Sequence, residues 1–157
     1  MTNAHQPTDA ARQMSETLAL LQAHVPIQRR VVHAGDRLFQ AGQPFTTLHV
    51  LNSGFVKVVN LAADGREQVV GLQFKGDWLG FDGIASERHT CDAVALDTGE
   101  VWSLRYADLL AAGAREPRLL QRLHAAMSRE LGRDRESMLS MATLPADARV
   151  ADFLRSW

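Results

Sequence analysis

The segment FVKVVNLAADGREQVVGLQF, residues 55–74, decides how the central part of this chain folds. Residues 55–60 and 68–74 are valine-rich runs of the kind that favours β-strands, and Asp64-Gly65 lies between them. An Asp-Gly pair flanked by strand-forming residues is a strong local signal for a hairpin turn. The segment therefore predicts an antiparallel β-hairpin.

The same pattern continues on both sides of this hairpin. Further strands are predicted at residues 30–33, 47–51, 92–96 and 101–104. Turn-forming residues separate the runs, at 34–36, 42–44, 52–54 and 75–77. Short strands with turns about every ten residues predict a small β-sandwich or barrel, not a parallel sheet with crossover helices.

Helical patterns precede and follow this β-rich region. Residues 9–24 carry apolar side chains at three- and four-residue steps, which predicts a short amphipathic helix with Thr8 as its N-cap. Residues 108–112 predict a short connecting helix. Pro117 suits the first turn of a long helix that runs to about residue 143. The expected fold is mainly β, with helices at both ends.

The long helix carries a narrow apolar seam with a period near 3.5 residues. The members of the seam are Leu120, Leu123, Met127, Leu131, Met138 and Met141. A helix of this length extends about 40 Å at 1.5 Å per residue, which is more than a small β-barrel covers. The seam therefore predicts a homodimer interface, and the alternative is packing against the chain's own β-region.

Asp134 interrupts this seam at a position where an apolar residue is expected. If Asp134 faces its symmetry mate, the two carboxylates weaken the dimer and make it switchable. In the alternative arrangement, Asp134 rotates outward beside Arg133 and Arg135. The sequence leaves both arrangements open.

Composition narrows the classes of function. The chain has 46% hydrophobic and 22% charged residues, as a globular domain does, and no apolar run approaches the ~18 residues of a membrane span. The first residues lack the pattern of a secretory signal, so the expected compartment is the cytoplasm and no membrane partner is expected. The net charge of −1 gives no overall attraction to nucleic acid.

The final segment, LPADARVADFLRSW at residues 144–157, predicts the start of another helix at Pro145. Its apolar stripe continues to Trp157, the last residue. A stripe that stops in mid-pattern suggests a packing partner in a further segment. We therefore interpret the chain as a part of a longer protein.

Several spaced features carry a resemblance to a known family. They are the glycine turns at Gly35, Gly42, Gly54, Gly65 and Gly76, the Gly-Phe-Asp segment at 80–82, the long helix, and LPADARVADFL. Together they resemble the CRP/FNR family of bacterial transcription regulators, and its FNR-like branch most of all. The resemblance implies a β-roll (double-stranded jelly roll) of the cyclic-nucleotide-binding type at 26–113, after a tail and short helix at 1–25. It also implies a dimerisation helix at 114–143 and the start of a winged helix-turn-helix domain at 144–157.

The function implied by the resemblance is the effector-sensing and dimerisation region of a DNA-binding transcription regulator. Such a region forms a homodimer and reaches DNA through a C-terminal domain that is mostly absent from this sequence. The hairpin at 60–69 occupies a place that can touch RNA polymerase in FNR-like activators, or it is only a solvated turn. No enzymatic activity is expected, because the His-x-His motif of a jelly-roll metalloenzyme is absent.

The resemblance also places an effector pocket near KGDWLGFDGI, residues 75–84. The expected members of the pocket are Gly80, Phe81, Asp82, Arg88, Thr90 and Cys91. Relatives that bind cyclic nucleotides carry Gly-Glu where this chain has Gly80-Phe81, and Arg-Ser where it has Thr90-Cys91. Because a buried phosphodiester without a positive partner costs several kcal/mol, cyclic nucleotide binding is not expected. We interpret KGDWLGFDGI as a tight corner, with Trp78 and Phe81 in the core.

Members of the FNR-like branch can hold an iron–sulfur cluster with four cysteines, three of them near the N-terminus. This chain has one cysteine, Cys91, and Trp102 stands at the position of the β-roll ligand. The resemblance therefore does not extend to the cluster, whose irons would lack thiolates. Cys91 is either a redox-sensing thiol, if it is exposed near Arg88, or a buried structural residue.

Six histidines leave a haem site as an alternative, because some family members bind haem and imidazole is its usual ligand. No two histidines show the close spacing of a metal site, and His33 and His49 are expected to be capped or exposed strand residues. We predict no cofactor and no metal. The alternative functions are a haem-based gas-sensing regulator of the same family and a freestanding cyclic-nucleotide-binding module.

Overall fold

The computed structural model of the chain describes residues 9–143, without the side chains of residues 10, 137, 138 and 140–143. The chain forms two compact units, Met1–Arg122 and Leu123–Trp157. In the described part, the first unit contains all the strands, one short 3-10 helix and two of the three α-helices. A third helix, α3 (Arg118–Thr143), begins in the first unit and continues into the second.

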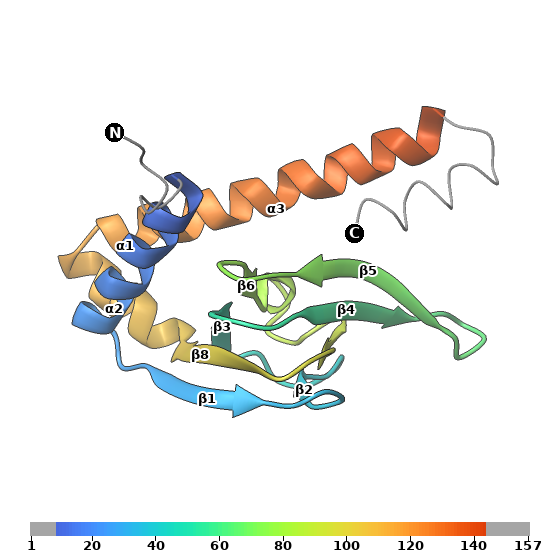
Figure 1. Cartoon of the computed structure of the whole chain (residues 1–157), viewed down its shortest axis with the longest axis horizontal. Coiled ribbons are helices and arrows are strands. Elements are labelled where there is room, and N and C mark those ends of the chain that lie inside the picture. The colour runs from blue at the N-terminus through green and yellow to red at the C-terminus, as the bar shows by residue number, and fades with distance from the viewer. Residues whose placement is uncertain (1–8, 144–157) are drawn as a thin grey trace, which may run out of the picture. The chain divides into compact units, whose positions relative to one another are not determined.

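Eight strands form two antiparallel four-stranded sheets in the described residues. One sheet has the order β1-β8-β3-β6 and consists of β1 (Gln28–Val32), β3 (Thr47–Leu51), β6 (Trp78–Leu79) and β8 (Gly99–Arg105). The other has the order β2-β7-β4-β5 and consists of β2 (Arg37–Phe39), β4 (Val56–Leu61), β5 (Glu67–Gln73) and β7 (Asp92–Ala95). The chain passes from one sheet to the other at nearly every connection (Figure 1). The predicted β-roll is therefore confirmed.

Both sheets contribute to one hydrophobic core. Its members are Val32, Leu51, Leu79 and Val101 from the first sheet, and Leu38, Phe39, Val56, Ala93 and Ala95 from the second, with Cys91 just before β7. Removing these side chains from water is the main favourable contribution to folding. The core thus holds the two sheets face to face and fixes the loops that connect them.

The β4–β5 hairpin confirms the prediction made from residues 55–74. The two strands pair along their length, with one irregularity in the register. At the turn, the backbone N–H of Gly65 donates to the carbonyl of Ala62 at 2.9 Å, and Gly65 has a φ of 85°. A residue with a Cβ is strained in this conformation, which explains why glycine follows Asp64.

Two helices lie together at one end of the sheets, α1 (Asp9–His24) and α2 (Tyr106–Arg115) (Figure 1). Glu16 of α1 pairs with Arg122 at 3.1 Å, and His24 lies 4.0 Å from Glu116. Glu116 belongs to the link between α2 and α3, and Arg122 to the first turns of α3. The start of α3 is therefore attached to α1.

The segment KGDWLGFDGI, which is predicted to be mainly a tight corner, also contains a short strand and a 3-10 helix. Trp78 and Leu79 form β6, opposite Val50 and His49, and the 3-10 helix η1 (Phe81–Gly83) follows. A strand of two residues shows no period in the sequence, and it exists because β3 supplies its hydrogen-bonding partners. For the same reason the sequence pattern missed β2, which is three residues long.

The core positions predicted for the two aromatic residues of this segment are confirmed in part. Trp78 is buried, with 4% of its surface exposed. Phe81 is half-buried and stacks on Trp78, with 6.0 Å between the ring centroids. The pair therefore closes one corner of the β-roll with apolar surface.

Some expectations concern residues that the structure does not describe. Thr8, the expected N-cap, and residues 144–157, the expected start of a DNA-binding domain, lie outside the described range. The side chains of Met138 and Met141 also lie outside it. Within residues 9–143, none of the helices combines the length and the apolar character that a membrane crossing requires.

Candidate effector site in the β-roll

The candidate site begins at Gly80, where the chain turns sharply after β6. Gly80 has a φ of 110°, and a Cβ at this residue would lie 3.2 Å from the carbonyl oxygen of Thr47. Backbone conformation and lack of space both favour glycine here. The turn leads directly into η1, which carries Asp82.

The loop between η1 and β7 lies against the loop between β2 and β3. The backbone N–H of Gly42 donates to the carbonyl of His89 at 2.7 Å, and the N–H of His89 donates to the carbonyl of Gln43 at 2.9 Å. A third bond runs from the N–H of Phe45 to the carbonyl of Glu87 at 2.9 Å. The two loops therefore hold each other in place.

Arg88 links the same two loops through its side chain. Its Nη1 donates to the carbonyl oxygen of Gly42 at 2.8 Å, and its own carbonyl accepts a bond from the Ser86 hydroxyl at 2.9 Å. The residue is exposed. The cation that the sequence places nearest to the candidate pocket is thus engaged with a backbone carbonyl.

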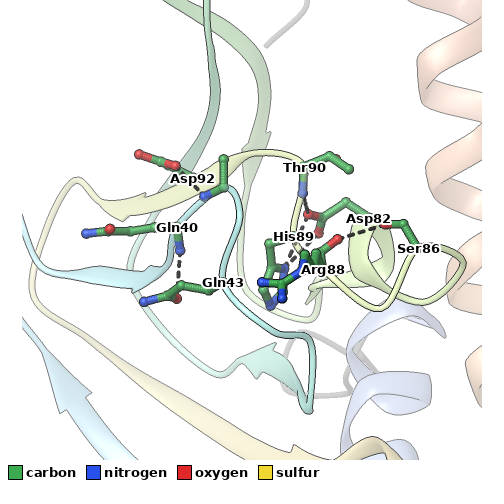
Figure 2. Close-up of polar contacts among 9 residues, drawn as sticks. Gln40, Gln43, Asp82, Ser86, Arg88, His89, Thr90 and Asp92 are labelled. Carbon is green, nitrogen blue, oxygen red and sulfur yellow. Dashed lines mark hydrogen bonds and ion pairs between the residues drawn. The ribbon is translucent and has the colours of Figure 1, made fainter.

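The carboxylate of Asp82 is the centre of the polar contacts in this loop. Its Oδ2 accepts a hydrogen bond from the backbone N–H of Thr90 at 2.8 Å. The two oxygens also lie 3.4 and 3.3 Å from Nδ1 of His89. Figure 2 shows the carboxylate beside both residues. Because an ionised carboxylate only accepts hydrogen bonds, a bond between the two groups requires a hydrogen on Nδ1.

His89 is buried, with 5% of its surface exposed. Its ring stacks on Phe39, with 3.9 Å between centroids, and meets Phe45 edge-on at 5.5 Å. Two aromatic rings and one carboxylate therefore set the orientation of the imidazole. No local sequence pattern singles out His89, because Phe39 and Phe45, which pack against its ring, are distant in the sequence.

His49 is buried rather than exposed, so one of the two alternatives expected for it is wrong. Its Nδ1 lies 2.8 Å from the hydroxyl of Ser103, and 5% of its surface is exposed. Burial, followed by the charges of Arg30 and His89, lowers the pKa of His49 to about 3. This imidazole is therefore neutral at physiological pH. His33 is exposed, as expected.

Cys91 is a buried core residue, with 7% of its surface exposed. Burial, then the charge of Asp82 and a hydrogen bond to its carboxylate, raises the pKa of the Cys91 thiol to about 12. A thiol with this pKa is protonated at neutral pH and reacts poorly as a nucleophile. Of the two alternatives for Cys91, the structural one is therefore correct. In the described part of the chain, no three His, Cys, Asp or Glu side chains are grouped to hold a metal ion.

Comparison with known proteins identifies the family of this chain. Residues 29–116 match the family model of the cyclic nucleotide-binding domain. The anaerobic regulatory protein of Pasteurella multocida is 32% identical over 135 residues, which cover 86% of this chain and 48% of that protein. The fumarate and nitrate reduction regulatory protein of Vibrio cholerae is 32% identical over 127 residues, 81% of this chain and 51% of that protein. The chain belongs to the CRP/FNR family.

The solved structures share the fold of this CRP/FNR chain. The c-di-GMP responsive global regulator CLP of Xanthomonas campestris aligns with a TM-score of 0.75 and 24% identity, covering 90% of this chain and 70% of that one. An identity at this level shows the fold alone. The chain spans about half the length of the curated relatives it matches. CRP/FNR proteins are transcription regulators rather than enzymes.

Trp102 stands where the resemblance to the FNR-like branch places a cluster cysteine. Its indole Nε1 donates to Oε1 of Glu100 at 2.7 Å, and Arg29 lies over its ring, 4.7 Å from the centroid. Glu100 also accepts a bond from Nδ2 of Asn52 at 2.9 Å. Hydrogen bonds from Trp102 and Asn52 lower the pKa of Glu100. The side chains around Trp102 therefore form a packed polar group. They do not supply the thiolate with which a protein holds an iron–sulfur cluster.

The predicted dimer seam of this CRP/FNR chain is buried at one end and exposed further along α3. Leu123 is 3% exposed in the single chain, and Leu120 and Met127 are half-buried. Leu131 is 57% exposed. Leu139, which the prediction did not include, is 65% exposed. Among the described side chains of α3, the large exposed apolar ones are therefore Leu131 and Leu139.

Proposed function

We propose that this chain is the effector-sensing and dimerisation region of a DNA-binding transcription regulator of the CRP/FNR type. Residues 26–113 sense the effector, and residues 114–143 form the dimer. The supporting observation is the order of elements, in which the β-roll of the family is followed by a helix of 26 residues with Leu131 57% exposed. A second copy that covers this leucine removes its apolar surface from water.

Asp134 makes this dimer weak and therefore switchable. The side chain of Asp134 is exposed in the single chain. Even so, partial desolvation by neighbouring atoms raises the pKa of Asp134, and the charge of Arg133 opposes this rise. Near a two-fold axis, two such carboxylates repel each other and lose part of their hydration. The dimer thus depends on how closely the two helices approach at this residue.

Signal transfer begins in the first unit of the chain. An effector in the β-roll favours one of two arrangements of the residues that lead into α3. Arg122 is a point of control, because it pairs with Glu16 of α1 at 3.1 Å, and Glu116 lies 4.0 Å from His24 at the end of the same helix. In the dimer, the paired helices set the spacing of two DNA-reading domains on a palindromic site.

The partners in this proposal are a second copy of the chain, DNA through a C-terminal domain, and an effector whose identity is unknown. The compartment is the cytoplasm, where DNA is reached directly. Contact with RNA polymerase through the hairpin at 60–69 stays a prediction. Its tip carries the pair of Arg66 Nε and Asp64 Oδ2 at 2.7 Å, on an exposed turn.

We further propose that the chain uses neither an iron–sulfur cluster nor a cyclic nucleotide. The sequence offers one cysteine, and burial raises the pKa of Cys91 to about 12, so thiolate ligands are lacking. For a nucleotide, Phe81 replaces the expected carboxylate and Thr90 replaces the expected arginine. Arg88 lies two positions before Thr90, is exposed, and already uses Nη1 for the carbonyl of Gly42.

Sedimentation velocity of the wild type and a Leu131→Glu variant tests the proposed dimer. We expect a concentration-dependent dimer for the wild type and a monomer for the variant, because a charge then replaces the exposed apolar side chain. Leu61→Glu is a matched control, because Leu61 is 67% exposed on β4 and lies outside the seam. The Leu61→Glu variant should form the same dimer as the wild type. A Leu131→Glu variant that stays as dimeric as the wild type would show that the proposed surface is wrong.

Two further measurements separate the alternatives. Isothermal titration with cyclic AMP and cyclic di-GMP should give no saturable heat with the wild type, whereas saturation would favour a nucleotide-binding module. An ultraviolet–visible spectrum of the purified protein should lack a Soret band. A Soret band would instead support the haem-based regulator.

A further inference from the structure

Two consecutive residues, His89 and Thr90, direct hydrogen-bond donors at the carboxylate of Asp82. The backbone N–H of Thr90 donates to Asp82 at 2.8 Å, and Nδ1 of His89 lies 3.3 Å from the same oxygen. A hydrogen bond with this carboxylate is also among the causes that raise the pKa of Cys91. The side chain of Asp82 is 17% exposed, so the cluster lies near the surface of the β-roll.

These donors are held in place by groups other than Asp82. The imidazole of His89 packs against Phe39 and Phe45, at centroid distances of 3.9 and 5.5 Å. The backbone of His89 is bonded to Gly42 and Gln43. Because these contacts do not involve Asp82, they hold His89, the residue before Thr90, independently of the carboxylate.

The chemistry of this donor set suits an oxyanion. Backbone and imidazole N–H groups bind the oxygens of carboxylates and phosphates alike. Among the neighbouring charges, Arg88 uses Nη1 for the carbonyl of Gly42, which leaves other N–H groups on the guanidinium. The carboxylate of Asp92 is neutralised separately by Arg37, at 3.0 Å. An anion added beside Thr90 and His89 would therefore meet the negative charge of Asp82.

We propose that the carboxylate of Asp82 occupies an oxyanion-binding position in the β-roll and thereby excludes phosphate-bearing ligands. A phosphate that approaches Thr90 and His89 meets a like charge. It must also displace an acceptor that is tethered in the same chain at a high effective concentration. Asp82 is thus a specificity-determining residue of the sensor domain. The inference rests on the sensing role proposed above, but it concerns a single chain and not the dimer.

The test is isothermal titration of the whole chain with inorganic phosphate and with cyclic AMP. We expect no saturable binding by the wild type. Asp82→Ala removes both the charge and the bound oxygen, and it should bind phosphate at least about tenfold more tightly than the wild type. Asp82→Asn keeps an oxygen for the Thr90 N–H but removes the charge, and it should bind phosphate measurably.

Asp36→Ala is the matched control. Asp36 Oδ2 accepts a hydrogen bond from the backbone N–H of His33 at 2.8 Å, the same distance as between Asp82 and Thr90, but in an exposed turn. This variant should behave as the wild type does. If Asp82→Ala does not fold, Asp82→Asn decides the question. A folded variant at position 82 that binds no phosphate overturns the proposal, and so does a wild type that binds as tightly as the variants. Sedimentation of the same samples separates this failure from a failure of the proposed dimer.

Discussion

His49 and Ser103 face each other across β3 and β8, and Nδ1 of His49 lies 2.8 Å from the Ser103 hydroxyl. Both residues are buried. Burial, and then the charges of Arg30 and His89, lowers the pKa of His49 to about 3. The interior of the β-roll therefore holds the imidazole of His49 in its neutral form. Folding strongly opposes protonation of this group.

The free energy of unfolding should fall as the pH is lowered from about 6.5 towards 3. The unfolded chain protonates His49 near its ordinary pKa of 6.5, whereas the folded protein resists protonation until about pH 3. The contribution of His49 to the free energy of unfolding is therefore complete above pH 6.5, and it is lost as the pH falls from 6.5 to about 3. At about 1.4 kcal/mol per pKa unit it amounts to several kcal/mol.

Urea unfolding at several pH values between about 7 and 4 measures this effect. His49→Gln should weaken the pH dependence, because the titrating group is gone. His33→Gln, at an exposed histidine, should leave it unchanged. An equally steep pH dependence in His49→Gln and the wild type would contradict the assignment.

Gly80→Ala should destabilise the fold by about 1–3 kcal/mol. Gly80 has a φ of 110°, and its new Cβ would lie 3.2 Å from the Thr47 carbonyl oxygen. Gly132→Ala is the matched substitution within a helix. Apart from the adjacent backbone of α3, no atom lies within 4 Å of the added Cβ. This substitution should therefore stabilise α3 by about 0.5–1 kcal/mol. Thermal unfolding of both variants gives the comparison. Shifts of the same sign would show that backbone conformation does not limit residue 80.

Glu100→Ala should cost about 1–3 kcal/mol of unfolding free energy, because it removes the acceptor for Trp102 and Asn52. Loss of this contact should also change the fluorescence of the indole. Glu67→Ala removes an exposed ion pair with Lys57 at 3.0 Å and should cost at most about 1 kcal/mol. Denaturant titration followed by tryptophan emission compares the two. Equal costs would show that the group around Trp102 contributes no more than a surface ion pair.

Asp134→Leu should strengthen the proposed dimer by roughly tenfold, because an apolar residue then continues the seam. Asp134→Asn should strengthen it less, since only the charge is removed. Sedimentation equilibrium over a range of concentrations measures both dissociation constants. If neither substitution changes the dimer, Asp134 lies away from the symmetry axis, as in the outward arrangement beside Arg133 and Arg135.

Local sequence patterns were sufficient to predict the elements that depend only on residues close together in the chain. The hairpin at β4–β5 follows from two valine-rich runs around Asp64-Gly65, and α3 follows from the period of its apolar residues after Pro117. A turn needs a particular backbone conformation, and a helix repeats one pattern, so both appear in a short window. The resemblance to the CRP/FNR family places Gly80 and Asp82 in the candidate site, but it does not predict the contact between Asp82 and Thr90 that defines the site.

Tertiary structure alone decided which side chains meet. The strand β6 exists because β3 lies beside it, and His49 is buried because it faces Ser103 on β8, 54 residues away. The carboxylate of Asp82 reaches the Thr90 N–H only after Gly80 has turned the chain. Hydrogen bonds and burial depend on distance in space, and residues that are far apart in the chain become neighbours only when the two sheets close over one core.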